Sequence, residues 1–138
     1  MEPLNPTRSK VVQRSQAVPM ALLFLFIFFG SLGVTPQVHG AVNSEKKRLS
    51  AAIRGDKFDP ASVAVDRLIK IGTPKAIDAL VSVGLGGDHY GIERYIGSKL
   101  VGLPAGDAFE RVCTLATEDR RAPVRVILTL VLARRKGL

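Results

Sequence analysis

Apolar side chains recur every three to four positions along the second half of the chain. Two such stripes lie between residues 59 and 84, each opposite polar side chains: Ala61, Ala64, Val65 and Leu68, then Ala76, Ile77, Leu80 and Val81. This spacing predicts two amphipathic helices. Asp59-Pro60 and Thr73-Pro74 predict their starts, because each pair places a capping side chain before a proline.

Three more helices are predicted after Gly87. The first two have apolar stripes, Ile92, Ile96, Leu100 and Leu103, then Ala108, Phe109, Val112 and Leu115. The third is an apolar run over residues 122–136 that contains few polar residues. Pro104 is expected to open the second of these helices. A strand over residues 124–132 is the alternative for the last run, because valine and isoleucine favour strands. We prefer the helix because the chain offers no second strand to pair with.

The first forty residues have the order of a secretory signal. Three basic side chains precede an apolar run from Met20 to Val34, and the small residue Gly40 precedes Ala41. Residues 1–40 are therefore predicted to be a signal peptide, cleaved before Ala41 or one residue later. An uncleaved membrane anchor at residues 20–34 is the alternative, although a spanning helix needs about 20 apolar residues. We expect an exported protein, periplasmic or secreted, that meets a membrane only through this segment.

The rest of the chain divides into a linker and a repeat domain. Residues 41–58 are polar and charged, and are interpreted as a linker with a short cap helix. Within residues 59–138, Asp88 and Arg94 lie six positions apart, as do Asp119 and Arg125, and the two sets are offset by 31 residues. A helix pair that recurs at this period buries its apolar face only against its neighbours, which predicts an all-α fold of stacked pairs, a short α-solenoid.

The residues Leu68-Ile-Lys-Ile-Gly-Thr-Pro-Lys-Ala-Ile-Asp-Ala-Leu80 resemble the bacterial HEAT-repeat family, including short versions similar to those in phycobilisome lyases. The Asp119–Arg125 pattern adds to this resemblance, which covers about residues 59–136. It implies an armadillo/HEAT-like superhelix of about two and a half helix pairs. It also implies that the aspartate caps a helix and the arginine ties successive repeats, roles that would fall on Asp88, Arg94, Asp119 and Arg125. Solvated surface charges are the alternative for all four.

The last predicted helix, residues 122–136, would lack its partner in the third pair. An apolar face left bare in this way predicts a protein partner, self-association through that helix, or a chain truncated at the C-terminus from a longer repeat protein.

A basic surface is expected as well, because the chain carries a formal net charge of +8. The candidate basic patch lies near the C-terminus and consists of Arg120, Arg121, Arg134, Arg135 and Lys136. Such a patch suits a polyanion or an anionic membrane. Export and the scarcity of aromatic side chains for base stacking argue against nucleic acid. The simpler interpretation is that basic residues complement the C-terminal end of a helix.

No catalytic, cofactor or metal site is predicted. The glycines at 84–87 lack the Lys-Ser/Thr that completes a phosphate loop. His39, His89 and Cys113 are too few for a zinc or iron site, and Cys113 is interpreted as a buried apolar side chain. The resulting hypothesis is a non-catalytic, exported helical-repeat module that binds a protein partner. The alternatives are a basic module for polyanions or anionic membranes, and an accessory domain of a larger HEAT-repeat enzyme or lyase.

Overall fold

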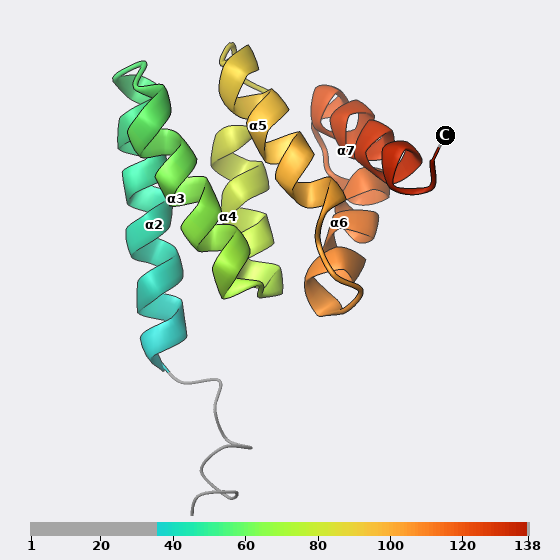
Figure 1. The fold of residues 1–138 in the computed structure, drawn as a ribbon, viewed down its shortest axis with the longest axis horizontal. Coiled ribbons are helices and arrows are strands. Elements are labelled where there is room, and N and C mark those ends of the chain that lie inside the picture. The colour runs from blue at the N-terminus through green and yellow to red at the C-terminus, as the bar shows by residue number, and fades with distance from the viewer. Residues whose placement is uncertain (1–35, 138) are drawn as a thin grey trace, which may run out of the picture. The chain divides into compact units, whose positions relative to one another are not determined.

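A computed structural model describes residues 36–137 of the chain, and in this range it is all-α, with six helices and no strand. The helices are α2 (Pro36–Arg54), α3 (Phe58–Ile71), α4 (Pro74–Gly84), α5 (Tyr90–Val101), α6 (Asp107–Glu118) and α7 (Ala122–Arg135) (Figure 1). The all-α prediction is confirmed, and α7 is a helix rather than the alternative strand. The apolar run Met20–Val34 lies outside the described residues.

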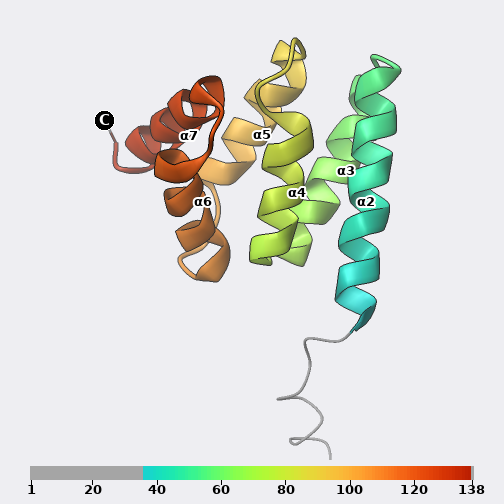
Figure 2. The same cartoon turned by 180° about the vertical axis from the view of Figure 1, so that it is seen from behind.

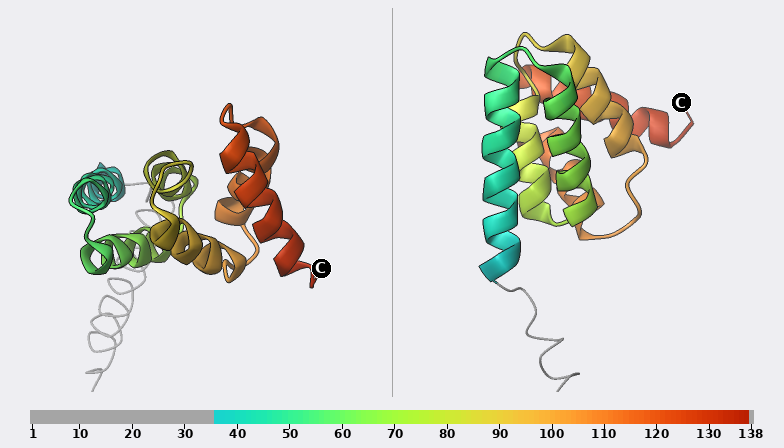
Figure 3. Two further views of the ribbon diagram at one scale, coloured as in Figure 1. Left: turned by 90° about the horizontal axis from the view of Figure 1, so that it is seen from above. Right: turned by 60° about the vertical axis from the view of Figure 1, so that its left-hand side comes forward.

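Taken in chain order, the helices form three pairs: α2 with α3, α4 with α5, and α6 with α7. α2 packs on α3 and α4, α4 packs on α6, α3 packs on α5, and α7 packs on both α5 and α6. Seen from above, α2 and α4 lie on one side and α3 and α5 on the other, while α7 crosses the C-terminal end obliquely (Figure 3). The helix of residues 122–136 is thus covered on two sides, by α5 and by α6.

Helix α2 is the largest departure from the expected elements. It has 19 residues and begins at Pro36, where the sequence predicts only a short cap helix within a linker. The helix also continues through Gly40 and Ala41, the predicted cleavage position. Its apolar side chains are few but well placed, since Val42, Leu49 and Ala52 are all buried against the neighbouring helices.

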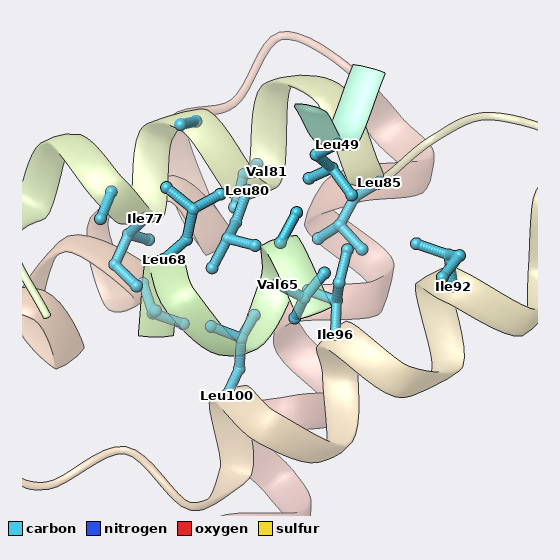
Figure 4. Packing of buried hydrophobic residues seen from close by; sticks show 14 of the residues in the cluster. Leu49, Val65, Leu68, Ile77, Leu80, Val81, Leu85, Ile92, Ile96 and Leu100 are labelled. Carbon is cyan, nitrogen blue, oxygen red and sulfur yellow. The ribbon is translucent and has the colours of Figure 1, made fainter. Parts of the chain in front are cut away.

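The core joins all six helices through the predicted stripes. Leu68 of α3, Leu80 of α4 and Ile96 of α5 are fully buried, and the inner face of α2 adds Leu49 (Figure 4). The helices approach closely where α4 ends, because Gly84 has no side chain. A Cβ at that position would overlap Ile96 Cδ1. The apolar periodicity thus predicts which side chains form the core.

Helix starts are predicted less well than helix faces. Thr73 caps α4 as expected, since its Oγ1 accepts a hydrogen bond of 3.3 Å from the Ala76 N–H. Asp59, however, lies in the first turn of α3, where Lys57 takes the N-cap position. Helix α6 begins at Asp107 rather than at Pro104. Proline lies in the first two positions of α4 and α7, but it does not mark the start of α3 or α6.

Candidate functional site

The exposed face of α7 is an apolar feature outside the core. Val126 is 59% exposed and Leu130 55% exposed, although both belong to a helix whose Val124, Leu128 and Val131 are buried. The two exposed side chains are four residues apart and therefore share one face of the helix. The predicted bare face of residues 122–136 thus exists, but it is narrower than expected because α5 and α6 cover the rest.

A groove of about 180 Å³ runs beside this face, between α5 and α7. We call it the α5/α7 groove; its lining residues are Tyr90, Glu93, Arg94, Gly97, Ile127, Leu130, Val131 and Arg134. The floor is apolar, and it includes Gly97, where a Cβ would make only an ordinary contact with Val131 at 3.8 Å. Tyr90 is 74% exposed and stands at the start of α5.

The rim of the α5/α7 groove is basic. Arg94 and Arg134 are exposed, and neither side chain forms an ion pair or hydrogen bond within residues 36–137. Glu93 is the one carboxylate that lines the groove, and it is already engaged: its Oε1 accepts the N–H groups of Gly86 and Gly87 at 2.6 and 3.0 Å. The groove therefore offers an apolar floor between two free guanidinium groups.

Asp119 lies in the turn between α6 and α7, where it contacts two arginines. Its carboxylate accepts hydrogen bonds from Arg121, and its backbone carbonyl accepts one of 2.6 Å from Arg125 Nη1. Hydrogen bonding to the Arg121 side chain holds the pKa of Asp119 below its usual 3.8, although partial desolvation opposes this shift. Asp119 and Arg125 are thus in contact, as the repeat pattern indicates, but through the backbone of Asp119.

Arg121 makes the long-range connection that the resemblance assigns to Arg125. Its guanidinium donates hydrogen bonds of 3.0 Å to the carbonyls of Val81 and Leu85, at the C-terminal end of α4. A guanidinium at the C-terminal end of a helix complements the helix dipole and can satisfy carbonyl groups there. Arg121 ties the third helix pair to the second.

The other repeat-pattern residues are not brought together. Asp88 and Arg94 are both exposed, and within the described part of the chain no hydrogen bond or ion pair joins them. They correspond to the alternative interpretation of solvated surface charges. Asp88 and Arg94 are six positions apart, like Asp119 and Arg125. Only Asp119 and Arg125 are in contact, in the turn between α6 and α7.

The residues of the predicted basic patch differ in their surroundings. Arg121 is used at the end of α4, and the Arg135 guanidinium lies 3.9 Å from the centre of the Phe109 ring. Arg135 also donates to the carbonyls of Val101 and Leu103, at the end of α5. Arg120, Arg134 and Lys136 remain exposed. Arg121 and Arg135 therefore contact the C-terminal ends of α4 and α5.

A polar cluster joins α3 to α5 on another face. Asp66 accepts hydrogen bonds from the Tyr95 hydroxyl and lies 2.9 Å from Lys99 Nζ, and Tyr95 packs edge-on against Phe58. The hydrogen bond from Lys99 lowers the pKa of Asp66. Cys113, interpreted from sequence as buried, is only half-buried. Across residues 36–137, no group of three or more potential ligands is arranged to hold a metal ion.

Comparisons with known proteins assign no family: no protein-family model matches the chain, and no curated protein or solved structure is detectably similar to it. Among the helices described, none is long and apolar enough to cross a membrane.

Proposed function

We propose that the chain is a non-catalytic helical-repeat module that binds a protein partner through the α5/α7 groove and the adjoining face of α7. The carrying observation is the pair of side chains Val126 and Leu130, each more than half exposed beside an apolar floor. Large apolar side chains clustered in this way on a small domain are typical of interaction sites.

The expected occupant is an amphipathic helix of another protein. A groove between two helices is a common receptor for the apolar face of a third helix, whose side chains enter at three- to four-residue spacing. The free guanidinium groups of Arg94 and Arg134 favour acidic residues at the edge of that face, by charge complementarity. Tyr90 supports the proposal as well, since exposed tyrosines frequently become binding hot spots.

The repeat architecture is part of the proposal. Three helix pairs packed side by side, each mainly against its neighbours, support a short α-solenoid of the armadillo/HEAT kind. We also propose export, periplasmic or secreted, on the order of features in residues 1–41. The mass of the protein from its source organism tests this: a species starting at Ala41 or Val42 supports cleavage, and a membrane-bound species with an intact N-terminus supports the anchor at residues 20–34.

The binding proposal is tested with the partner isolated from the source organism. The tagged full chain is used to recover bound proteins, and each candidate is purified and titrated against the pure chain. We expect the double variant Val126→Asp/Leu130→Asp to bind the true partner at least tenfold more weakly. Both positions are solvent-exposed, so the variant is expected to keep its helical circular dichroism.

Val63→Asp is the matched control, because Val63 is also an exposed valine, 49% accessible, but lies on α3. It should leave the affinity unchanged. Equal losses in the two variants would contradict the proposed site. A pure chain that forms dimers, and loses them only in the Val126→Asp/Leu130→Asp variant, would make a second copy the occupant instead of another protein.

A further inference from the structure

A second groove lies between α2 and α4, the two helices that run side by side in Figure 2. It consists of two hollows of about 360 and 380 Å³, which adjoin because Asn43 and Lys46 line both. We call it the α2/α4 groove. After the predicted cleavage position it extends along α2 from Val42 to Arg54, a distance of about 18 Å at the helical rise of 1.5 Å per residue.

The α2/α4 groove is strongly basic. Its exposed cations are Lys46, Lys47, Arg54 and Lys75. None of these four forms an ion pair with a carboxylate within residues 36–137. Asp78 is the one acid that lines either hollow, and it is neutralised by Arg111, whose Nε lies 2.7 Å from its Oδ1. The uncompensated charge is therefore positive along the whole groove.

Neutral hydrogen-bonding groups alternate with these cations. Asn43, Ser50 and Ser82 line the groove. Val42 and Ala79 supply apolar contact at the end of the groove that lies nearer the N-terminus of α2. At that end Lys75 Nζ lies 3.2 Å from His39 Nδ1, so an ammonium and an imidazole converge on one point. This combination suits a ligand that carries both negative charges and backbone-like amide groups.

We propose that the α2/α4 groove binds an extended acidic segment of another protein. A groove of this length holds about five residues of extended chain, at about 3.3 Å per residue. Carboxylates of the segment would pair with Lys75, Lys46 and Arg54, and its amide groups would hydrogen-bond with the neutral side chains. This inference goes beyond the proposed function, because it concerns a different surface and a different class of partner segment.

Two other polyanions fit less well. Binding of single-stranded nucleic acid depends on aromatic platforms for the bases, and the groove contains no phenylalanine, tyrosine or tryptophan. Binding to an anionic bilayer by a surface helix depends on large apolar side chains that enter the lipid, and the apolar residues of this groove are the small Val42, Ala79 and Val83.

The test measures fluorescence anisotropy of a labelled eight-residue peptide of alternating glutamate and serine, titrated with the full chain. The groove variant is Lys46→Gln/Lys75→Gln, whose positions both lie after the predicted cleavage site. The control is Lys70→Gln/Lys136→Gln, which removes the same charge from exposed positions on α3 and at the end of α7. We expect the groove variant to bind the peptide at least tenfold more weakly, and the control less than threefold.

Several outcomes would overturn the inference. Equal losses in the two double variants would mean general attraction to a basic protein, and no binding at millimolar peptide would mean that no such site exists. The same titration is run with an octamer of deoxythymidine and with phosphatidylserine vesicles; tighter binding of either, lost in the groove variant, would reassign the groove. Val126→Asp/Leu130→Asp should bind the peptide normally, so failure here is distinguishable from failure of the α5/α7 proposal.

Discussion

The carboxylate of Asp119 holds Arg121 in position with both of its oxygens. Oδ1 accepts the Arg121 backbone N–H at 2.8 Å and its Nε at 3.2 Å, and Oδ2 lies 3.2 Å from Nη2. Held in this way, the guanidinium reaches the carbonyls at the end of α4. One acidic residue thus orients the side chain that connects the third helix pair to the second.

Replacing Arg121 with glutamine should destabilise the fold by about 1–2 kcal/mol, because hydrogen bonds to a charged group contribute roughly this much when partly exposed. The measurement is the free energy of unfolding in urea. Arg120→Gln is the control, since Arg120 is exposed and makes no hydrogen bond within residues 36–137. Its unfolding free energy should change by less than about 0.5 kcal/mol. Equal effects in the two variants would show that the α4 contact contributes nothing.

Asp119 should make stability depend on pH in the acidic range. Its folded-state pKa lies below 3.8, so the folded state favours the ionised form more than the unfolded state does. The corresponding stability is present above about pH 4 and is lost as the pH falls through the folded-state pKa. Wild type and Asp119→Asn should therefore differ most in unfolding free energy near pH 6 and converge as the pH falls below the folded-state pKa of Asp119. Asp88→Asn, at an exposed position, should run parallel to wild type throughout.

Gly84→Ala should be destabilising by about 1–3 kcal/mol, because the new methyl group overlaps Ile96 Cδ1 in a closely packed core. Ile96→Val removes that Cδ1 atom, so Gly84→Ala/Ile96→Val should be more stable than the sum of the two single changes predicts. A double-mutant cycle on thermal or urea unfolding measures this coupling. Gly97→Ala, where a Cβ meets only Val131 at 3.8 Å, should be neutral or stabilising. Strict additivity at positions 84 and 96 would contradict the packing described.

Arg135→Lys should cost about 1 kcal/mol although the charge is kept. Lysine lacks the planar guanidinium that stacks on Phe109 and donates at the same time to carbonyls at the end of α5. Arg134→Lys, one position earlier and exposed, should change stability little. Thermal unfolding of the two variants provides the comparison. If they shift equally, the contact between Arg135 and Phe109 has no structural role.

The helix faces could be predicted from sequence because burial imposes a period on the residue types. Ile92, Ile96, Leu100 and Leu103 are all buried as the stripe indicates. Helix α2 could not be predicted at its full length, since it is mostly polar and its packing partners come later in the chain. Glu45 shows this: it is 8% exposed and its Oε1 pairs with Arg48 and with Arg67 of α3. Residues 45–48 are all charged, and this pattern gave no indication that one side of the helix is buried.

The candidate sites were harder to predict than the fold. The repeat spacing singled out Arg125, yet Arg121 is the residue whose guanidinium reaches Val81, 40 positions earlier. Spacing along a chain does not specify which of two nearby arginines points toward another helix. The cations of the α2/α4 groove were missed for the same reason, because Lys46 and Lys75 come together only when the first and second helix pairs pack.

The middle pair of helices, α4 and α5, connects the two proposed binding surfaces. One wall of the α2/α4 groove is α4, and one wall of the α5/α7 groove is α5. The outer pairs make their main contacts with this middle pair. The most direct route for any thermodynamic coupling between an acidic segment in one groove and a helix in the other therefore runs through α4 and α5, which contact each other. By reciprocity, each ligand would change the affinity of the other by the same factor.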